Sequence, residues 1–217
     1  MTVKSVMTKN PLSVSPETSV TDAKALMLKK DISKLPVLDK DGRLVGIITK
    51  NDLLKAGPSD ATTLDMFEIG YLLSKLTVSK VMTKNVVSVT EDEVVEEAAR
   101  IMVDNQIGCV PVMNGNLLIG IVTESDLFHM FIDMFGARYA GVRVTVLVTN
   151  RQGVLARMAQ KIADAESNII SIVTRDAADG KKYVTIKATD ITIDRMKAIT
   201  DDCGATVEDI RMVHAAE

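Results

Sequence analysis

The apolar pattern of the first two thirds of the chain occurs twice. Val6-Met7-Thr8-Lys9-Asn10 returns 75 positions later as Val81-Met82-Thr83-Lys84-Asn85. After the loss of one residue in the second copy, the segment 46–53 (GIITKNDL) aligns with 120–127 (GIVTESDL). Collinear matching over this distance indicates a tandem duplication.

Each copy predicts the element order β-α-β-β-α. We expect the first helix to open at Ser15-Pro16-Glu17 in one copy and at Thr90-Glu91-Asp92-Glu93 in the other, because hydroxyl and acidic side chains suit a helix N-terminus. Two strands follow with tight turns between them, at Asp41-Gly42 and Asn114-Gly115. A last helix begins at Thr49 or Thr123.

Two further segments have strongly apolar helical patterns. Between the copies, Leu64, Phe67, Tyr71 and Leu72 trace one helical face, which we expect to pack on its own domain, with a partner site as the alternative. The segment 127–135 is apolar nearly all round and ends at Gly136 as a C-cap, which favours burial by self-association. His129 lies in it and is expected to be a packed or interface residue.

The C-terminal eighty residues follow a different pattern. Alternating valines over 143–149 predict a strand, the turn 150–153 is given a possible Asn150 cap, and Val154, Leu155, Met158, Ile162 and Ala165 are expected on one helix face. Further strands are predicted over 169–174, 183–188 and 206–213, with a helix over 194–203. The order β-α-β-β-α-β is that of a ferredoxin-like unit.

Composition and charge narrow the class of protein. The net charge of −3, with neither part basic, argues against a nucleic-acid partner. The two cysteines, Cys109 and Cys203, form neither a disulfide framework nor a zinc pattern. The N-terminus lacks the apolar run of a signal peptide and no stretch is long enough for a membrane span, so we expect a cytoplasmic protein.

The candidate chemistry lies at the repeated Thr-x-x-Asp. Thr49 and Asp52 occupy the N-cap and N3 positions of a helix that emerges from a strand, as do Thr123 and Asp126. A capping box explains them structurally. At such a junction the hydroxyl can also donate to a phosphate and the carboxylate can accept both ribose hydroxyls. The two interpretations are compatible.

The duplicated V-M-T…P-V…G-I-[IV]-T-x-x-D-L pattern over residues 1–135 resembles a CBS-domain pair, or Bateman module. The resemblance implies two clefts that bind AMP, ADP, ATP or S-adenosylmethionine. It implies that Asp52 and Asp126 bind ribose and that Thr49 and Thr123 contact phosphate. The other residues implied in nucleotide binding are Thr8, Lys34, Pro36, Ile47, Thr83, Cys109, Pro111 and Ile121.

The C-terminal unit, with its NRQG turn, VLARM helix start and SNI strand, resembles an ACT domain. The resemblance implies a site for a small ligand such as an amino acid, formed by Asn150, Gln152, Gly153, Val154 and Leu155 and closed by Asn168 and Ile169 of a neighbouring protomer. Asn150, Gln152 and Glu166 stand where the family commonly has an acidic residue, proline and glycine. A pure dimerisation role stays open beside ligand binding.

The whole chain resembles the acetoin-utilisation B-type regulatory proteins of bacteria. We therefore expect an α+β chain with CBS repeats over 1–57 and 78–136, a helical linker over 58–77 and an ACT-like domain over 141–217. The expected function is that of a non-catalytic, homodimeric sensor acting on an unknown target protein, without a metal, a required cofactor or a membrane. The alternatives are a scaffold with empty clefts and a regulatory subunit of an enzyme.

Overall fold

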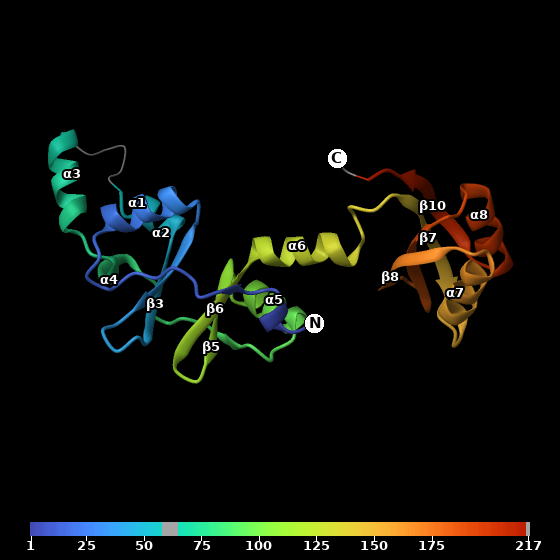
Figure 1. Ribbon diagram of the computed structural model, residues 1–217, viewed down its shortest axis with the longest axis horizontal. Helices are drawn as coiled ribbons and strands as arrows, with labels where there is room; N and C mark the ends of the chain where they lie inside the picture. Colours follow the sequence, from blue (N-terminus) through green and yellow to red (C-terminus); the bar gives the residue numbers. More distant parts are fainter. Residues whose placement is uncertain (58–64, 216–217) are drawn as a thin grey trace. The chain divides into compact units, whose positions relative to one another are not determined.

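The computed structural model describes residues 1–57 and 65–215, which form two units, Met1–Leu127 and Phe128–Glu217. Each unit is described by itself below, and helix α6 begins in the first and continues into the second. The elements of the first unit (Figure 1) are the 3-10 helix η1 (Val3–Ser5), β1 (Thr8–Lys9), α1 (Val20–Lys30), β2 (Lys34–Leu38), β3 (Leu44–Thr49), α2 (Lys50–Lys55), α3 (Met66–Lys75), α4 (Val78–Val81), β4 (Val89–Thr90), α5 (Val95–Asp104), β5 (Cys109–Asn114), β6 (Leu117–Thr123) and α6 (Glu124–Met134).

The two copies fold as the duplication predicts. In each copy two antiparallel strands form a hairpin, β2 with β3 and β5 with β6. Gly42 and Gly115 supply the left-handed conformation that the turns need, with φ of 76° and 58°. Each copy has its own core, one around Leu35 and Ile48 and the other around Val110 and Val122.

The first helix of each copy begins later than its sequence predicts. Helix α1 starts at Val20 with Ser19 as N-cap, and α5 starts at Val95 after Val94, which makes no side-chain cap. The reason is that these helix starts are tied to distant backbone: the N–H of Val20 donates to the carbonyl of Leu76 (2.8 Å), and that of Val95 to the carbonyl of Met1 (3.2 Å). The prediction of starts at Ser15 and Thr90 was therefore wrong.

The segments that lead into the two copies, residues 2–9 and 77–84, are exchanged between them. The first lead-in packs on the second copy: Val3 is buried in that core, and β1 pairs with β6. The second lead-in packs on the first copy, where Val78 is buried and Thr83 pairs with Ile47. Each copy is therefore completed by the other copy's lead-in.

A methionine against a glycine fixes each exchanged lead-in. A Cβ at Gly120 would stand 2.4 Å from Sδ of Met7, and a Cβ at Gly46 would stand 2.4 Å from Sδ of Met82. Any larger residue at these glycines would displace the methionine. The repeated Met and Gly of the motif thus form two matched contacts, each of which joins one copy to the other.

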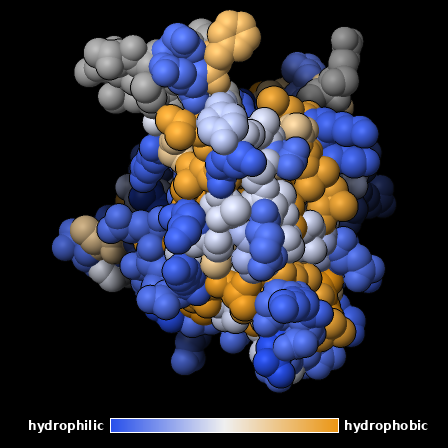
Figure 2. Space-filling model, turned by 90° about the vertical axis from the view of Figure 1, so that its left-hand side faces the viewer, coloured by the Kyte–Doolittle hydropathy of each residue, from blue (hydrophilic) through white to orange (hydrophobic). Residues whose placement is uncertain are grey.

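Helix α3 does not bury the face that we expected it to pack on its own domain. Phe67, Tyr71 and Leu72 are 88%, 65% and 54% exposed, and among the apolar side chains whose burial is described in this segment, Leu73 and Leu76 are partly buried. Leu64 of the predicted face lies outside the described residues. The likewise exposed Leu28 and Leu54 belong to the neighbouring helices α1 and α2. Figure 2, which views this end of unit 1, shows apolar groups between hydrophilic ones.

The second unit has the predicted β-α-β-β-α-β order. Its four strands form one sheet in the order β10-β7-β9-β8. Helices α7 and α8 cover one face (Figure 1), where Val144, Val146, Met158 and Met196 are buried together. The elements are β7 (Gly141–Thr149), α7 (Val154–Asp164), β8 (Asn168–Asp176), β9 (Lys181–Thr189), α8 (Ile193–Asp202) and β10 (Thr206–Val213).

The end of α6 is held in this second unit. Gly136, with φ of 59°, closes the helix as predicted, and its carbonyl accepts a 2.7 Å hydrogen bond from Nζ of the buried Lys187. Burial, with Arg143 nearby, lowers the pKa of Lys187. Three apolar side chains of α6 stay exposed, Phe128 by 68%, Phe131 by 55% and Met134 by 54%, whereas Leu127, Met130 and Ile132 are partly buried. His129 is exposed too, so within one chain it is not packed.

Candidate functional site

The two Thr-x-x-Asp motifs form matching caps at strand–helix junctions. Oδ2 of Asp52 accepts hydrogen bonds from the backbone N–H (2.8 Å) and the hydroxyl (2.7 Å) of Thr49. Oδ2 of Asp126 accepts the same two bonds from Thr123, both at 2.7 Å. Within the described part of the chain, Oδ1 of each carboxylate accepts no hydrogen bond from protein. Each partly buried carboxylate therefore keeps one oxygen for a ligand.

The first of two related clefts, cleft A, has a volume of about 530 Å³. It contains five of the predicted binding residues: Lys34, Ile47, Thr49, Thr83 and Cys109. Thr49 belongs to the first copy, whereas Thr83 comes from the lead-in of the second. The other residues that line cleft A are Ser33, Lys50, Asn51, Asn85, Val86, Val87, Gln106, Ile107, Gly108 and Glu124.

Cleft B, of about 390 Å³, is the counterpart around the second motif. It contains Thr8, Lys34, Ile121 and Thr123 of the predicted residues. Here Thr123 belongs to the second copy and Thr8 comes from the lead-in of the first. The other residues that line cleft B are Asn10, Pro11, Leu12, Asp31, Ile32, Ser33 and Ser125.

Four predicted residues do not line these clefts. Asp52 and Asp126 each lie one position beyond a lining residue, Asn51 and Ser125 respectively. Pro36 and Pro111 are buried in mid-strand, directly opposite Ile47 and Ile121. The prolines therefore support the cleft walls from behind.

Sequence reasoning missed the loops that follow α1 and α5. Residues 31–33 line cleft B and residues 106–108 line cleft A. The duplication contained the signal, because Ile32 and Ile107 are separated by the same 75 positions as the V-M-T segments. Each loop serves the cleft that contains the other copy's Thr-x-x-Asp motif.

Cys109 lines cleft A and contacts apolar wall residues of both clefts. It packs with Ile47 and Ile121 in a small apolar cluster. Burial raises the pKa of the Cys109 thiol to about 11, while the charge of Lys34 lowers it and that of Glu124 raises it. The thiol is thus a protonated, apolar part of the wall at neutral pH.

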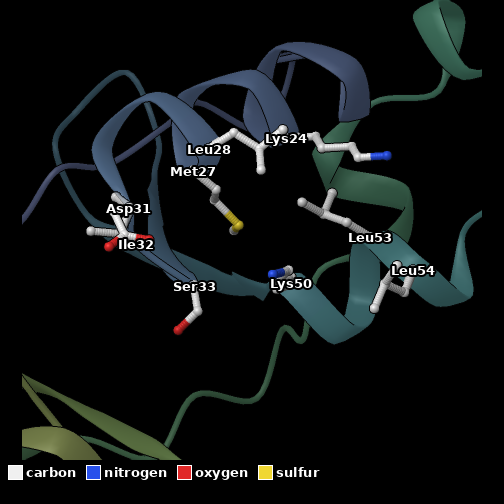
Figure 3. A pocket seen from close by; sticks show the side chains of 9 residues that line it. All are labelled: Lys24, Met27, Leu28, Asp31, Ile32, Ser33, Lys50, Leu53 and Leu54. Atoms are coloured by element: carbon white, nitrogen blue, oxygen red, sulfur yellow. The ribbon is translucent and has the colours of Figure 1, made fainter.

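A third cavity, of about 300 Å³, lies between α1 and α2 (Figure 3). Met27 and Leu53 point into it from the two helices, and Lys24 lies at its edge. It shares Ser33 and Lys50 with cleft A. Neither Thr49 nor Asp52 lines it, and its wall combines apolar side chains of α1 and α2 with the polar residues Lys24, Asp31, Ser33 and Lys50.

The predicted ACT site is only partly assembled in one chain. The turn 150–153 is exposed and leads into α7, whose N-cap is Gly153 with φ of 82° and no side-chain cap. The predicted Asn150 cap was therefore wrong: its backbone N–H instead donates to Gly180 (2.9 Å), which holds the turn against the β8–β9 turn. Val154 is partly buried, whereas Gln152 and Leu155 are exposed, so Leu155 lies off the predicted core face.

Asn168 and Ile169 lie at the other end of the same sheet. Thr149, before the turn, pairs with Lys181 at the start of β9, whereas Asn168 pairs with Thr189 at its end. One copy therefore cannot bring these two parts together. Glu166, where the family commonly has glycine, has φ of 57°, a conformation in which glycine is unstrained.

Residues 1–57 and 65–215 contain neither a candidate membrane-spanning helix nor a candidate metal site. No helix there is both long and apolar enough to cross a membrane. The same residues contain no group of three or more His, Cys, Asp or Glu side chains that could hold a metal ion.

Comparison with known proteins gives two family matches. The CBS domain model matches residues 3–59 and 78–133, and the model of the TTHA0829-like ACT domain matches residues 140–211. Among curated relatives, the L-aspartate semialdehyde sulfurtransferase of Methanocaldococcus jannaschii is 33% identical over 130 residues, which cover 59% of this chain and 23% of that protein. The uncharacterized protein MJ1426 of the same organism is 34% identical, covering 61% of this chain and 92% of that one. This chain thus matches under a quarter of the named enzyme.

Two solved structures share the fold of the first unit. The CBS domain pair of protein MJ0100, in complex with 5′-methylthioadenosine and S-adenosyl-L-methionine, is 32% identical and covers 60% of this chain and 95% of that one, with a TM-score of 0.51. A protein from Vibrio cholerae described as an acetoin utilization protein (AcuB) is 31% identical and covers 63% and 93%, with a TM-score of 0.53. With both copies matched by the family model, the chain belongs to the CBS-domain proteins and carries a tandem CBS pair followed by an ACT domain.

Proposed function

We propose that the CBS pair is a sensor whose clefts A and B bind adenosine-containing ligands, either an adenine nucleotide (AMP, ADP or ATP) or S-adenosylmethionine. One observation carries the proposal: each cleft joins the threonine of one copy's strand–helix junction to the threonine of the other copy's lead-in. The volumes suit small molecules of this size, since typical ligand pockets measure about 300–1,000 Å³. The related pair of MJ0100 is described in complex with two adenosine derivatives, which supports the same ligand class here.

The capping motif gives each ligand group a chemical role. The free Oδ1 of Asp52, one position beyond Asn51 of cleft A, and that of Asp126, one position beyond Ser125 of cleft B, accept the ribose hydroxyls. The Thr49 and Thr123 hydroxyls, which donate to Oδ2 of Asp52 and Asp126 in the unbound chain, turn their single proton to the phosphate, while the backbone N–H of each threonine keeps its bond to the carboxylate. Ile47 and Ile121, each 6–8% exposed, form the apolar wall for adenine. A ligand that binds only to the folded cleft therefore stabilises unit 1, including the first turn of α2 or α6.

The direct test is a titration of the full chain with AMP, ADP, ATP, S-adenosylmethionine and NAD, followed by calorimetry and thermal shift. We expect two sites for at least one adenosine ligand. Asp52→Ala should remove one site and Asp126→Ala the other. Two full sites in the double variant would exclude these carboxylates, and the absence of any thermal shift across the panel would refute the sensor.

Asp22→Ala is the matched control for the loss of a cap. Asp22 accepts a 2.7 Å hydrogen bond from the Ser19 hydroxyl at the start of α1, as Asp52 does from the Thr49 hydroxyl, but it lacks the bond from the N-cap backbone N–H, is exposed and lines neither cleft. Loss of a cap costs about 1 kcal/mol. The control should therefore lower stability by a similar amount and leave both binding sites intact.

The proposal extends to a homodimer, for which α6 supplies the surface. Phe128, Phe131 and Met134 are each more than half exposed on this helix. The split ACT site requires a second copy as well, because Asn168 lies at the opposite end of the sheet from the turn 150–155. We expect light scattering to give a dimer and Phe131→Ser to weaken it; a monomeric wild type at micromolar concentration would refute this interface.

We further propose that the ACT domain binds a small metabolite such as an amino acid. We also propose that the chain acts without catalysis on a target protein and, more specifically, that this target belongs to acetoin metabolism. The exposed turn at the N-terminus of α7 supports a carboxylate-bearing ligand. A thermal-shift panel of amino acids on the full chain tests it. The exposed apolar faces of α3 and α6 favour a scaffold as the second candidate function, which predicts partner binding with empty clefts.

A further inference from the structure

Lys34 occupies a position that no other cationic residue of the CBS pair shares, among the residues that the structure describes. It lines both cleft A and cleft B. Its side chain is half-buried, and it takes part in none of the ion pairs of the described chain. Its Cε lies 3.4 Å from the position of a Cβ on Gly108, so the chain of Lys34 crosses from the first copy to the loop of the second.

The two copies differ at the position of Lys34. Lys34 is directly opposite Thr49 across the first hairpin, and the equivalent residue opposite Thr123 in the second hairpin is Cys109. One threonine is therefore paired across its hairpin with a lysine and the other with a buried cysteine. Cleft B has no lysine of its own copy and must share Lys34.

The remaining charges favour cleft A for an anion. Lys50 lines cleft A beside Lys34, with the carboxylate of Glu124 as the opposing charge. The charged residues that line cleft B are Lys34 and Asp31, one of each sign. When Lys34 is engaged by an anion in cleft A, cleft B is left with a net negative lining.

We propose that Lys34 is a shared phosphate-binding residue, so that a phosphate-bearing ligand in cleft A weakens the binding of a second one in cleft B. An adenosine ligand without phosphate does not use Lys34 and binds both clefts independently of it. The proposal rests on the proposed adenosine-ligand function and adds a rule for occupancy: a nucleotide with phosphate fills its second cleft only at higher concentration than its first, whereas Lys34 imposes no such difference on ligands without phosphate. A charge-assisted hydrogen bond of this kind corresponds to roughly tenfold in affinity.

The test compares AMP with 5′-methylthioadenosine, which has the nucleoside but no phosphate, by calorimetry on the full chain. The measured quantity is the ratio of the two site affinities. We expect this ratio to be about tenfold larger for AMP than for 5′-methylthioadenosine. Lys34→Met, which keeps the apolar stem of the side chain as far as Cε and removes the ammonium, should reduce the AMP ratio to that of 5′-methylthioadenosine and leave the 5′-methylthioadenosine ratio unchanged.

Two further variants sharpen the result. Lys84→Met is the matched control, since Lys84 follows Thr83 but lines neither cleft, and it should change nothing. Asp31→Asn should strengthen the second AMP site; its φ of 51° at the end of α1 is one that asparagine tolerates. If Lys34→Met does not fold, the wild type decides: with cleft A filled by AMP, 5′-methylthioadenosine should enter the remaining site with undiminished affinity while AMP does not.

Equal AMP and 5′-methylthioadenosine ratios in the wild type, or an AMP ratio unchanged in Lys34→Met, would overturn the role of Lys34 while the adenosine-ligand function stands. Binding of 5′-methylthioadenosine without any binding of AMP would do the same. Failure of both probes, together with the nucleotide panel, would instead reject the proposed function itself.

Discussion

The exchanged lead-ins make a prediction about which methionine is energetically coupled to which glycine. Gly46→Ala places a Cβ 2.4 Å from Sδ and 3.0 Å from Cγ of Met82, a residue 36 positions away in the other copy's lead-in. Because two of the crowded atoms are not at the end of the side chain, Met82 has to change its rotamer or move. Met7, which an unexchanged arrangement would put against Gly46, instead contacts Gly120.

The magnitudes follow from packing. Overfilling a packed site costs about 1–3 kcal/mol, so Gly46→Ala should destabilise unit 1 by that amount. Met82→Ala removes a partly buried side chain and should cost about 1–2 kcal/mol. In the double variant the new methyl group enters space that the methionine has left, so the total should fall short of the sum by at least ~1 kcal/mol.

The assay is urea unfolding of the full chain, followed by circular dichroism because the chain has no tryptophan. Amide hydrogen exchange in β3 assigns the change to unit 1. The control is the crossed pair Gly46→Ala with Met7→Ala, which should be additive within about 0.5 kcal/mol. Coupling of Gly46 to Met7 and not to Met82 would refute the exchange, and with it the assembly of each cleft from both copies.

Three other predictions concern stability. Folding raises the pKa of Cys109 from 9.0 to about 11, so unit 1 should lose roughly 2–3 kcal/mol as the pH rises from 9 to 11, and Cys109→Ala should abolish this loss in urea unfolding at each pH. The pH dependence of stability due to Lys187 has the opposite sign to that of Cys109. Burial lowers the pKa of Lys187 below 10.5, so the folded state loses this proton at a lower pH than the unfolded state does. The free energy of unfolding of unit 2 should therefore rise with pH up to 10.5. The free energy of unfolding of the wild type should therefore rise relative to that of Lys187→Met over that pH interval. Glu166→Gly relieves a left-handed φ of 57° and should stabilise unit 2 by about 0.5–1 kcal/mol, as a higher melting temperature.

Each of these has a distinct contrary result. An unchanged loss above pH 9 in Cys109→Ala would assign the titration to another group. A pH-independent difference between wild type and Lys187→Met would mean that burial and the nearby Arg143 do not lower the pKa of the Lys187 ammonium. A lower melting temperature for Glu166→Gly would show that the Glu166 side chain contributes more than its backbone strain costs.

Local signals were sufficient for the elements that depend on local chemistry. The caps at Thr49 and Thr123, the Asp-Gly and Asn-Gly turns, and the β-α-β-β-α-β order of the second unit all follow from residues adjacent in sequence. The pairing of the lead-ins could not be predicted. The V-M-T segment fits either copy equally well, because duplication makes Gly46 and Gly120 equivalent partners.

The two wrong helix starts have one physical cause, namely long-range backbone pairing. The segments near Ser15 and Thr90 satisfy local capping rules, yet the helices start at Val20 and Val95, where N–H groups reach the carbonyls of Leu76 and Met1. The face of α3 was expected to be buried because it is apolar. A pattern of apolar residues fixes which face needs a partner but not whether that partner belongs to the same chain.

Duplication followed by divergence at a few cleft positions accounts for two sites that share a framework but differ in charge. The framework consists of the residues retained in both copies: the Thr-x-x-Asp cap, the proline behind the wall, and the methionine that holds the other copy's glycine. The residues that differ, Lys34 against Cys109 and Lys50 against Glu124, all line a cleft. Because the exchanged lead-ins make each cleft depend on both copies, a change at one position reaches both clefts. Under the proposed function, a ligand in one cleft of such a pair therefore alters the binding of a ligand in the other.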